Sequence, residues 1–401
     1  MSSMVVKFGG TSVGSGERIR RAAESIADEV GKGNKVCVVV SAMGNTTDNL
    51  LGEMEKIGGA DEKDENQIVS MGERTSVRMF KAALENQGVE AHFVEPGKEN
   101  WPIITDEEGE LLKDKTEKKV ESLSEDMEES VPVVCGFLGE SQEGKVTTLG
   151  RGGSDTSAMI LGNCLSADEV VIVTDVDGIM TGDPGNVNDP RNLDKITVDE
   201  MQDLSIRGAG VVAPSALRYK ENGLNVRIVH HKHGDVGANG TLIEGEGVHT
   251  HVVEMRDEPL AAVTVAGRSI IETPNLLARL SSVLGEHDIN IYGDSTGNDS
   301  MSFFVDQEHG MEAERLLHRE VVDDEKFSSV SLREDVGMLI LSGSDFIDRP
   351  GIIYEVVKPL YENNINIVEI ISSVTSIVVF VDYNVLSDAF KLMEDKFEDT
   401  K

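Results

Sequence analysis

The chain of 401 residues is poor in aromatic residues, in cysteine and in positive charge. Aromatic side chains make up 4% of it, and its three cysteines are too few and too widely spaced for a disulfide framework, so we expect buried free thiols. No apolar run approaches the roughly 18 residues that a membrane-spanning helix needs. The first residues, MSSMVVKFGG, lack the basic start and apolar stretch of a signal peptide. These absences favour a protein of the cytoplasm.

Positive charge is especially scarce, because 37 Lys and Arg stand against 73 Asp and Glu, for a formal net charge of -36. Such an excess argues against nucleic acid and anionic membranes as partners. The acidic residues are spread along the whole chain, with a dense stretch near residues 105–130. We interpret them as an adaptation to a salt-rich cytoplasm, where screening relieves the self-repulsion.

A chain of this length exceeds what one hydrophobic core usually supports, so two or three domains are expected. Strands and helices alternate over about the first 250 residues, which is typical of an α/β fold with a largely parallel sheet. The helix over 17–30 is predicted from apolar residues at i, i+3, i+4 and i+7. Strands are predicted at 4–8, 35–43, 131–137, 169–176 and 224–231, and further helices from residue 46 and over 72–87.

Two segments after residue 260 have similar sequences. Each is predicted to run from a strand through a glycine-containing loop and a helix to a strand at Ile-Asn-Ile, then to a further strand. HDINI (287–291) and NNINI (363–367) are the clearest repeat. The repeat indicates a regulatory pair of modules rather than a second catalytic domain.

The first glycine-rich stretch, VVKFGGTSVGSG, puts Lys7 before Gly9 and Gly10, the reverse of the order in a Walker-type phosphate loop. A strand that leads through glycines into a helix presents backbone N–H groups to an anion. The same glycines also suit a tight turn without any ligand. These residues alone support a phosphate site and a plain turn equally.

A second stretch, TTLGRGGSDTSA, places Arg151 among glycines, just before Ser154 and Asp155 begin a predicted helix. Helix capping would explain the serine and the aspartate, but not an arginine in that turn. An arginine can hold a carboxylate through two parallel hydrogen bonds, and an aspartate can pair with an ammonium group. The pattern favours a binding site for an amino acid.

A third stretch, VTDVDGIMTGDP, places Thr174 and Asp175 after a buried strand. Ligands of open α/β sheets bind at the carboxyl ends of strands, although Asp-Gly and Asp-Pro also mark ordinary turns. Its aspartates could also meet a metal ion, but no spacing of His or Cys supports a metal held by the protein alone. The stretch by itself is a weak signal.

Three more polar residues stand near predicted helix starts. Glu73 lies in a predicted glycine turn that opens a helix, and Ser41 and Thr47 follow the second strand. Capping of the helix starts explains all three without a ligand.

In this order, KFGGTS, SAMGNTTDNL, GER, TTLGRGGSDTSA and TDVDG resemble the motifs of the aspartokinases, members of the amino-acid kinase superfamily, and the repeat resembles their paired ACT domains. The resemblance covers nearly the whole chain. It implies a three-layer αβα kinase domain with a largely parallel central sheet over residues 1–255. Two ferredoxin-like (βαββαβ) ACT domains would follow over 256–333 and 334–401, and these two can interleave.

The resemblance also implies a reaction, transfer of the γ-phosphoryl group of ATP to the side-chain carboxylate of L-aspartate. The product would be 4-phospho-L-aspartate, on the route to lysine, threonine and methionine. Mg²⁺ would enter with ATP, and no metal would be held by the protein alone. Because the attacking carboxylate is ionised at neutral pH, no general base is required.

Residues matching the family's motifs take its roles. The catalytic set implied in this way is Lys7, Gly9, Gly10 and Asp155; the aspartate-binding set is Ser41, Thr47, Glu73, Arg151 and Ser154; the nucleotide-binding set is Lys7, Phe8, Gly9, Gly10, Thr174, Asp175, Met180 and Asp183. Departures from the family's motifs fall on the nucleotide side of the site. The family usually has an aromatic residue where this chain has Met180 and an arginine in place of Gly185. It usually has a lysine in place of Gly210 and a histidine in place of Ala213. Contacts to the nucleotide are therefore expected to differ, with Arg191 or Arg207 as replacements.

The ACT repeats imply control by an end-product amino acid, lysine or threonine, and a homodimer or higher homo-oligomer. Candidate effector contacts are the loops SIIETPN (269–275) and SSVTSI (372–377) with the Ile-Asn-Ile segments. A dimer scaffold without sensing is the alternative for these repeats. For the whole chain the alternatives are another amino-acid kinase, acting on glutamate, N-acetylglutamate or a carbamate-like acid, and a non-catalytic amino-acid sensor.

Overall fold

The computed structural model describes residues 2–176, 178–183, 185–205, 211–247, 251–322, 324–343, 346, 351–373 and 375–398. Arg207 and Gly210, which the sequence placed near the nucleotide, lie outside these residues. Contacts divide the chain into two compact units, Met1–His249 and Thr250–Lys401. The division precedes the boundary expected at residue 255, because β12 (Val252–Met255) pairs with β16 (Phe327–Ser342) in the second unit.

The first unit is built on a mostly parallel sheet, as the sequence predicts. Its strands are hydrogen-bonded in the order β3 (Ala91–Val94), β5 (Val131–Cys135), β2 (Lys35–Val40), β1 (Ser3–Phe8), β8 (Glu169–Thr174), β10 (Asn225–His230), β11 (Thr241–Glu244) and β9 (Lys195–Thr197). Within this order only the β10–β11 pair is antiparallel among the described residues. A smaller sheet joins β4 (Ile104–Thr105), β6 (Leu138–Ser141) and β7 (Val146–Thr148).

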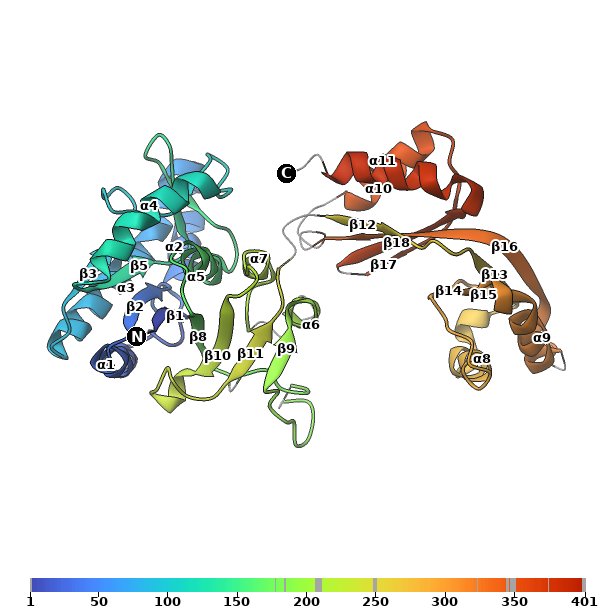
Figure 1. Cartoon of the computed structure of the whole chain (residues 1–401), viewed down its shortest axis with the longest axis horizontal. Helices are drawn as coiled ribbons and strands as arrows, with labels where there is room; N and C mark the ends of the chain where they lie inside the picture. Colours follow the sequence, from blue (N-terminus) through green and yellow to red (C-terminus); the bar gives the residue numbers. More distant parts are fainter. Residues whose placement is uncertain are drawn as a thin grey trace. The chain divides into compact units, whose positions relative to one another are not determined.

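Helices cover both faces of this sheet (Figure 1). Phe8 packs on Phe80 of α3 with ring centroids 5.1 Å apart, whereas its neighbour Lys7 reaches Asp155 of α5. Because successive side chains of a strand point to opposite faces, α3 and α5 lie on opposite sides of β1. The helices of this unit are α1 (Gly16–Gly31), α2 (Thr46–Lys56), α3 (Glu62–Asn86), α4 (Lys113–Asp126), α5 (Gly153–Cys164), α6 (Val198–Leu204) and α7 (Pro214–Leu217), with a 3-10 turn at His231–His233.

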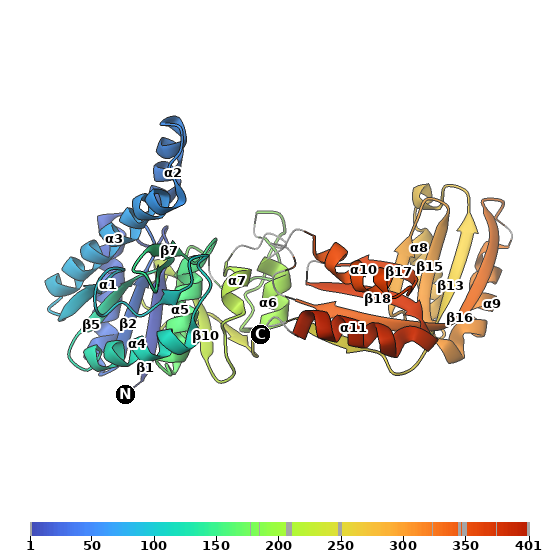
Figure 2. The ribbon, with the colours of Figure 1, turned by 90° about the horizontal axis from the view of Figure 1, so that it is seen from above.

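The predicted amphipathic helix is confirmed as α1. Ser15 caps it by accepting a hydrogen bond from Arg18 N, and Ile19, Ala23 and Ile26 are buried on the sheet side. The prediction for Glu73 is wrong in its local structure, because α3 begins at Glu62 and Glu73 lies in its middle. The glycine at position 72 led to the predicted turn, since glycine is unfavourable inside helices. α2 and the start of α3 project from the sheet as a helical hairpin (Figure 2).

The second unit contains one continuous antiparallel sheet with two repeats. Its strands follow the order β14 (Gly293–Thr296), β15 (Ser300–Asp306), β13 (Leu260–Gly267), β16, β18 (Ser376–Asp382) and β17 (Ile367–Ser372), and β12 pairs with β16. Its helices are α8 (Leu276–Gly285), α9 (Gly310–Val321), α10 (Ile352–Glu362) and α11 (Leu386–Glu398), with 3-10 turns at Ile270–Glu272, Gln307–His309 and Tyr383–Val385. β16 runs from the part with α8 and α9 to the part with α10 and α11, so both repeats share it (Figure 1).

The repeat in the sequence is a repeat in backbone geometry. Asp288 and Asn364, which precede the two Ile-Asn-Ile segments, both have φ of 57°, a left-handed conformation that these residue types tolerate. The prediction that Ile-Asn-Ile forms a strand is wrong in the first copy, since β14 begins at Gly293. In the second copy only Ile367 belongs to β17. None of the helices in the described ranges combines the length and apolar character that crossing a bilayer requires.

Candidate active site

A cavity of about 250 Å³ lies at the carboxyl ends of β1 and β2. Carboxyl ends of parallel strands are where open α/β sheets bind ligands. The cavity brings together seven residues predicted from the sequence: Lys7, Gly10, Ser41, Thr47, Glu73, Ser154 and Asp155. Ala42, Gly44, Phe137, Gly152 and Gly153 complete its lining.

The central polar contact of the cavity is an ion pair between two predicted residues. Lys7 Nζ lies 2.5 Å from Oδ1 of Asp155, and both side chains are about nine-tenths buried. Asp155 belongs to the first turn of α5, where a carboxylate is stabilised by the helix dipole. Its other oxygen, Oδ2, accepts a hydrogen bond from Ala213 N at 3.1 Å. The sequence suggested that Asp155 would meet the ammonium group of an amino-acid ligand, whereas its partner in the structure is the side chain of Lys7.

The two glycines after Lys7 have different local roles. Gly9 N donates to Val173 O at 3.2 Å, so this amide is engaged by β8. Gly10 O accepts from Gly44 N at 2.9 Å, and a Cβ on Gly10 would lie 2.9 Å from Ala42 O. A side chain at position 10 would therefore separate the loop after β1 from the loop after β2. Gly10 is required for this close approach of the two loops.

Glu73 is a buried carboxyl group that reaches the cavity from α3. It is 3% exposed, and its Oε1 accepts a hydrogen bond from Ala42 N at 3.1 Å. Its other oxygen, Oε2, is buried and has no hydrogen-bond partner among the described residues. Burial raises the pKa of Glu73 from 4.5 to about 7, although hydrogen bonds from the backbone oppose the shift. A charged or donor group of a ligand is what this oxygen lacks.

Gly72 explains how Glu73 comes so close to the loop after β2. A Cβ at position 72 would lie 2.7 Å from Cβ of Ala42, closer than two carbon atoms pack. The glycine therefore lets α3 touch this loop, and the next residue reaches the Ala42 amide. The sequence identified Glu73 as a site residue but assigned it to a turn.

Arg151 is displayed on a turn and does not line the cavity. Gly150 and Gly152 on either side of it have φ of 72° and 76°, which favour glycine. The side chain of Arg151 is exposed, and its carbonyl oxygen accepts from Ser215 Oγ at 3.2 Å. Gly152 itself is the N-cap of α5, and no side chain caps this end. Ser154 and Asp155 are thus free of the capping role that the sequence also allowed.

Of the predicted nucleotide residues, Lys7 and Gly10 line the cavity, whereas Phe8, Thr174, Asp175, Met180 and Asp183 do not. Thr174 ends β8, and its carbonyl oxygen is 2.9 Å from Nδ1 of His231. The carboxylate of Asp183 accepts from Gly185 N and from Asn186 Nδ2, each at 2.8 Å, and so organises its own turn. Asp175 is exposed, and Met180 forms an isolated bridge with Asn192. Phe8 is 2% exposed and points to the opposite face of the sheet from Lys7.

Phe137 is a cavity residue that sequence reasoning missed. Its φ is 69°, which is uncommon for a residue other than glycine. Its backbone N–H donates a hydrogen bond to Ser157 Oγ at 3.1 Å. Backbone strain of this kind gathers at functional sites. The signal that could have found it is its position at the carboxyl end of the predicted strand at 131–137, where ligands of parallel sheets bind.

The chain is similar to known families and proteins over nearly its whole length. Residues 3–230 match the amino acid kinase family, and residues 263–321 and 331–395 each match an ACT domain. Aspartokinase 2 of Bacillus subtilis is 32% identical over 421 residues, covering 100% of this chain and 99% of its own. The aspartokinase of Mycolicibacterium smegmatis is 33% identical and covers 99% and 96%.

Solved structures show the same likeness. The aspartate kinase from Synechocystis has a TM-score of 0.79 and 27% identity, covering 98% of this chain and 69% of that one. Aspartokinase III of Escherichia coli, in complex with aspartate and ADP, has a TM-score of 0.54 and 22% identity, with coverage of 98% and 99%. At that level of identity the second likeness concerns the fold alone.

Proposed function

Because the chain belongs to the amino acid kinase family, as a member of its aspartokinases, we propose that the cavity around Lys7 transfers the γ-phosphoryl group of ATP to the side-chain carboxylate of L-aspartate. The observation that carries this assignment is the meeting of Lys7, Asp155 and Glu73 on one cavity. In this cavity Lys7 offers a positive charge to a phosphoryl group, and Glu73 offers a carboxylate to the ammonium group of an amino acid. Aspartate that receives a phosphoryl group needs both.

Lys7 is the residue that we assign to the reacting phosphoryl group. A lysine fixed by a buried partner requires little reorganisation when negative charge develops beside it. Asp155 fixes it, and Asp155 is in turn held by Ala213 N. Because the attacking carboxylate of aspartate is already ionised, positioning and electrostatics are sufficient for the transfer.

Glu73 and Arg151 are the residues that we assign to the ends of the amino acid. Glu73 Oε2 is buried without a partner, and an ammonium group would satisfy it. Arg151 is exposed on a turn between two left-handed glycines, from which a guanidinium can hold a carboxylate through two hydrogen bonds. Ser41, Thr47 and Ser154 add hydroxyl groups on the cavity wall.

The nucleotide and its metal ion are the finer part of the proposal. Lys7 and the glycine loop suit the phosphates of ATP, whereas Thr174, Asp175, Met180 and Asp183 would have to form the adenosine side. Mg²⁺ would be held chiefly by phosphate oxygens and water, as in many phosphoryl-transfer sites, and would neutralise their charge there. Asp183 is poorly suited to bind Mg²⁺ in this arrangement, because Gly185 N and Asn186 Nδ2 of its own turn already donate to its carboxylate.

Regulation is assigned to the second unit. Its two ACT repeats share β16, and an end-product amino acid such as lysine or threonine would bind there. Pairing of two chains through these sheets would give a homodimer or higher homo-oligomer. The cytoplasm is the proposed location, since the thiols of Cys37 and Cys135 are free and buried.

A coupled assay of ADP release tests the assignment of the substrate. With ATP and Mg²⁺, turnover is expected with L-aspartate and not with glutamate or N-acetylglutamate. GTP and pyrophosphate in place of ATP test the phosphoryl donor, and a preference for either one would contradict it. Formation of an acyl phosphate, trapped as the hydroxamate, confirms transfer to a carboxylate. Binding of aspartate and ATP without product would instead identify a sensor.

A further inference from the structure

A second cavity, of about 210 Å³, lies on the other side of β1 from the Lys7 cavity. Its floor is apolar and consists of Phe8, Val173 and Val229, at the ends of β1, β8 and β10. One wall is α1, and the other is the loop from His230 to Val236 that follows β10. Since Phe8 and Lys7 are neighbours on one strand, the two cavities open on opposite faces of the sheet.

The rim of this cavity carries positive charge from both walls. Arg18 and Arg21 extend from α1, and Lys232 extends from the loop after β10. Such a gathering is unusual in a chain with a net charge of -36. One acidic residue, Asp235, also lines the cavity, and its carboxylate accepts a hydrogen bond from Gly237 N at 2.8 Å. Glu17 pairs with Arg21 at 2.7 Å, but both side chains are more than half exposed, so this pair is weak.

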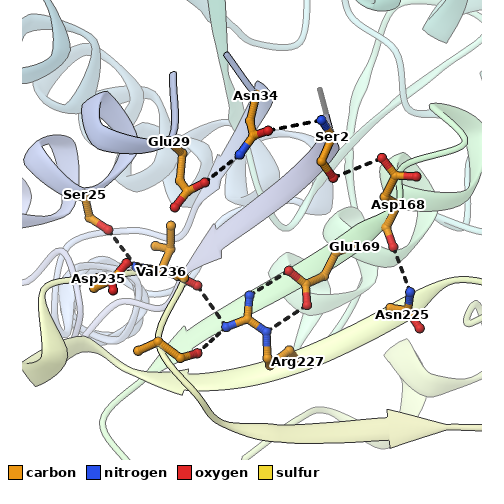
Figure 3. A network of polar contacts seen from close by, with 12 residues as sticks. Ser2, Ser25, Glu29, Asn34, Asp168, Glu169, Asn225, Arg227, Asp235 and Val236 are labelled. Carbon is orange, nitrogen blue, oxygen red and sulfur yellow. Dashed lines mark hydrogen bonds and ion pairs between the residues drawn. The ribbon is translucent and has the colours of Figure 1, made fainter. Parts of the chain in front are cut away.

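The loop that forms one wall is held in place from beneath (Figure 3). Arg227 of β10 donates to Val236 O at 3.0 Å and also to Ala238 O. The same guanidinium makes two parallel hydrogen bonds with Glu169, at 2.7 and 2.6 Å. From α1, Ser25 Oγ accepts from Val236 N at 2.7 Å. The cavity is therefore formed before any ligand binds, which lowers the entropic cost of binding.

The cavity is also linked to the glycine loop of the kinase site. The guanidinium of Arg18 donates to Thr11 O, and Ser12 Oγ donates to Val173 O at 3.1 Å. Thr11 and Ser12 directly follow Gly9 and Gly10. A ligand that takes a hydrogen bond from Arg18 would compete with Thr11 O for this guanidinium. It would thereby affect the loop beside Lys7 without entering the kinase cavity.

We propose that this second cavity binds a phosphomonoester dianion with an apolar body. Three cations on two walls match a doubly charged phosphate better than a single carboxylate. The apolar floor requires a body, and 210 Å³ is more than the 150 Å³ or so in which an apolar cavity holds benzene. Apart from Phe8, none of its lining residues belongs to the sets predicted for aspartate or ATP, and Phe8 points away from Lys7, so this proposal is independent of the kinase assignment.

The test is isothermal titration of the full chain with phenyl phosphate, at a KCl concentration at which the chain is folded. Arg21→Glu and Lys232→Glu are each expected to weaken binding by about tenfold or more, as loss of a charged contact does. Arg20→Glu is the matched control, since Arg20 is the adjacent exposed arginine of α1, pairs with Glu24, and does not line the cavity. It is expected to change the affinity less than twofold. Unchanged unfolding temperatures show that the three variants fold alike.

Two further comparisons separate this site from the kinase cavity and define its ligand. The Lys7→Ala variant is expected to bind phenyl phosphate as the natural chain does. Loss of binding in this variant would place the ligand in the kinase cavity and overturn the proposal. Equal weakening by Arg20→Glu would show a general effect of charge and would also overturn it. Inorganic phosphate lacks the apolar body, and benzoate lacks the second negative charge. Each is expected to bind at least tenfold more weakly than phenyl phosphate. Equal binding of either one contradicts the proposed class. Competition by AMP or by glucose 6-phosphate supports the proposal and tells a nucleoside phosphate from a sugar phosphate.

Discussion

Lys7 Nζ lies 2.5 Å from Oδ1 of Asp155, which ties the carboxyl end of β1 to the first turn of α5. The two residues are 148 positions apart in the chain (155 minus 7) and come from opposite halves of the first unit. Removal of two charges from water costs free energy that their attraction only partly returns. The pair therefore serves to fix the position of the lysine side chain, which the proposed function assigns to the phosphoryl group.

Replacement of Lys7 is expected to remove catalysis rather than substrate binding. Lys7→Met should lower kcat by roughly 10²–10³, the usual effect of losing one preorganised charge, in the ADP-release assay. Asp155 would then lack its partner, so a loss of stability of about 3–5 kcal/mol is expected in urea unfolding. Asp155→Asn in the same chain should restore stability but not turnover. Lys35→Met, which removes a surface pair with Glu128, is the control, and equal kinetic loss in it would contradict the assignment.

Arg151→Lys is expected to raise the KM for aspartate by about tenfold and to change kcat little, because a lysine cannot form the two parallel hydrogen bonds of a guanidinium. Initial rates at varied aspartate and saturating ATP measure both constants. Arg20→Lys, at an exposed site on α1, supplies the control for a generic change of cation. An unchanged KM in Arg151→Lys would remove this residue from the aspartate site.

Glu73 predicts a dependence of the KM for aspartate on pH. Its pKa is raised by burial to about 7, so it is mostly protonated at pH 6 and mostly charged at pH 8. Because the charged form attracts the ammonium group, the KM for aspartate should fall as the pH rises through 7. Glu73→Gln should show a higher KM without this dependence. An identical pH profile in the variant would exclude Glu73 from contact with the substrate.

The same group predicts how stability depends on pH. The folded chain keeps a proton on Glu73 that the unfolded chain releases between pH 4.5 and about 7. The contribution of Glu73 to the free energy of unfolding therefore declines as the pH rises through that window, by at most on the order of 3 kcal/mol. The free energy of unfolding of Glu73→Gln, relative to the natural chain, should rise between pH 4.5 and 8 without substrate. Glu53→Gln, an exposed carboxyl on α2, should show no such trend.

Gly72→Ala is expected to destabilise the chain and raise the KM for aspartate, against the general rule for helices. Alanine normally stabilises a helix interior by about 1 kcal/mol relative to glycine. At position 72, however, its methyl group would lie 2.7 Å from Cβ of Ala42 and would push α3 from the loop after β2. Gly52→Ala is the matched control, since a Cβ there meets no atom within 4 Å, and it should be stabilising. Urea unfolding of both variants measures the change in the free energy of unfolding, which should be negative for Gly72→Ala and positive for Gly52→Ala.

The acidic composition predicts that salt stabilises the chain. With a net charge of -36, self-repulsion opposes folding in dilute buffer, and at about 1 M salt the screening length falls to about 3 Å. The unfolding temperature should therefore rise by several degrees between low KCl and about 1 M KCl, as followed by circular dichroism. Sucrose at matched osmolality separates screening from exclusion of solute. Full stability in dilute buffer would contradict adaptation to a salt-rich interior.

The sequence predicted the fold well where apolar periodicity is strong. Strands such as β2 and β8 are buried on both faces, so their sequences are continuous apolar runs that only a covered sheet accommodates. It failed where a single residue has two possible roles. Gly72 was interpreted as a helix breaker, whereas its actual role depends on Ala42, which is distant in the sequence. The Ile-Asn-Ile segments were taken as strands because their β-branched residues favour strands, yet most of them lie in connections.

By itself, the sequence determined the order of the elements, the doubled module at the end of the chain and the excess of negative charge, and it predicted Lys7, Arg151 and Asp155 as site residues. These properties are local, or follow from short motifs with a set spacing. Only the tertiary structure decided that Lys7 pairs with Asp155, that Glu73 reaches the cavity from the middle of a helix, and that cations from α1 and from the loop after β10 surround a second cavity. The reason is physical, since these contacts join residues far apart in the chain, and their distances are set by how the helices pack on the sheet.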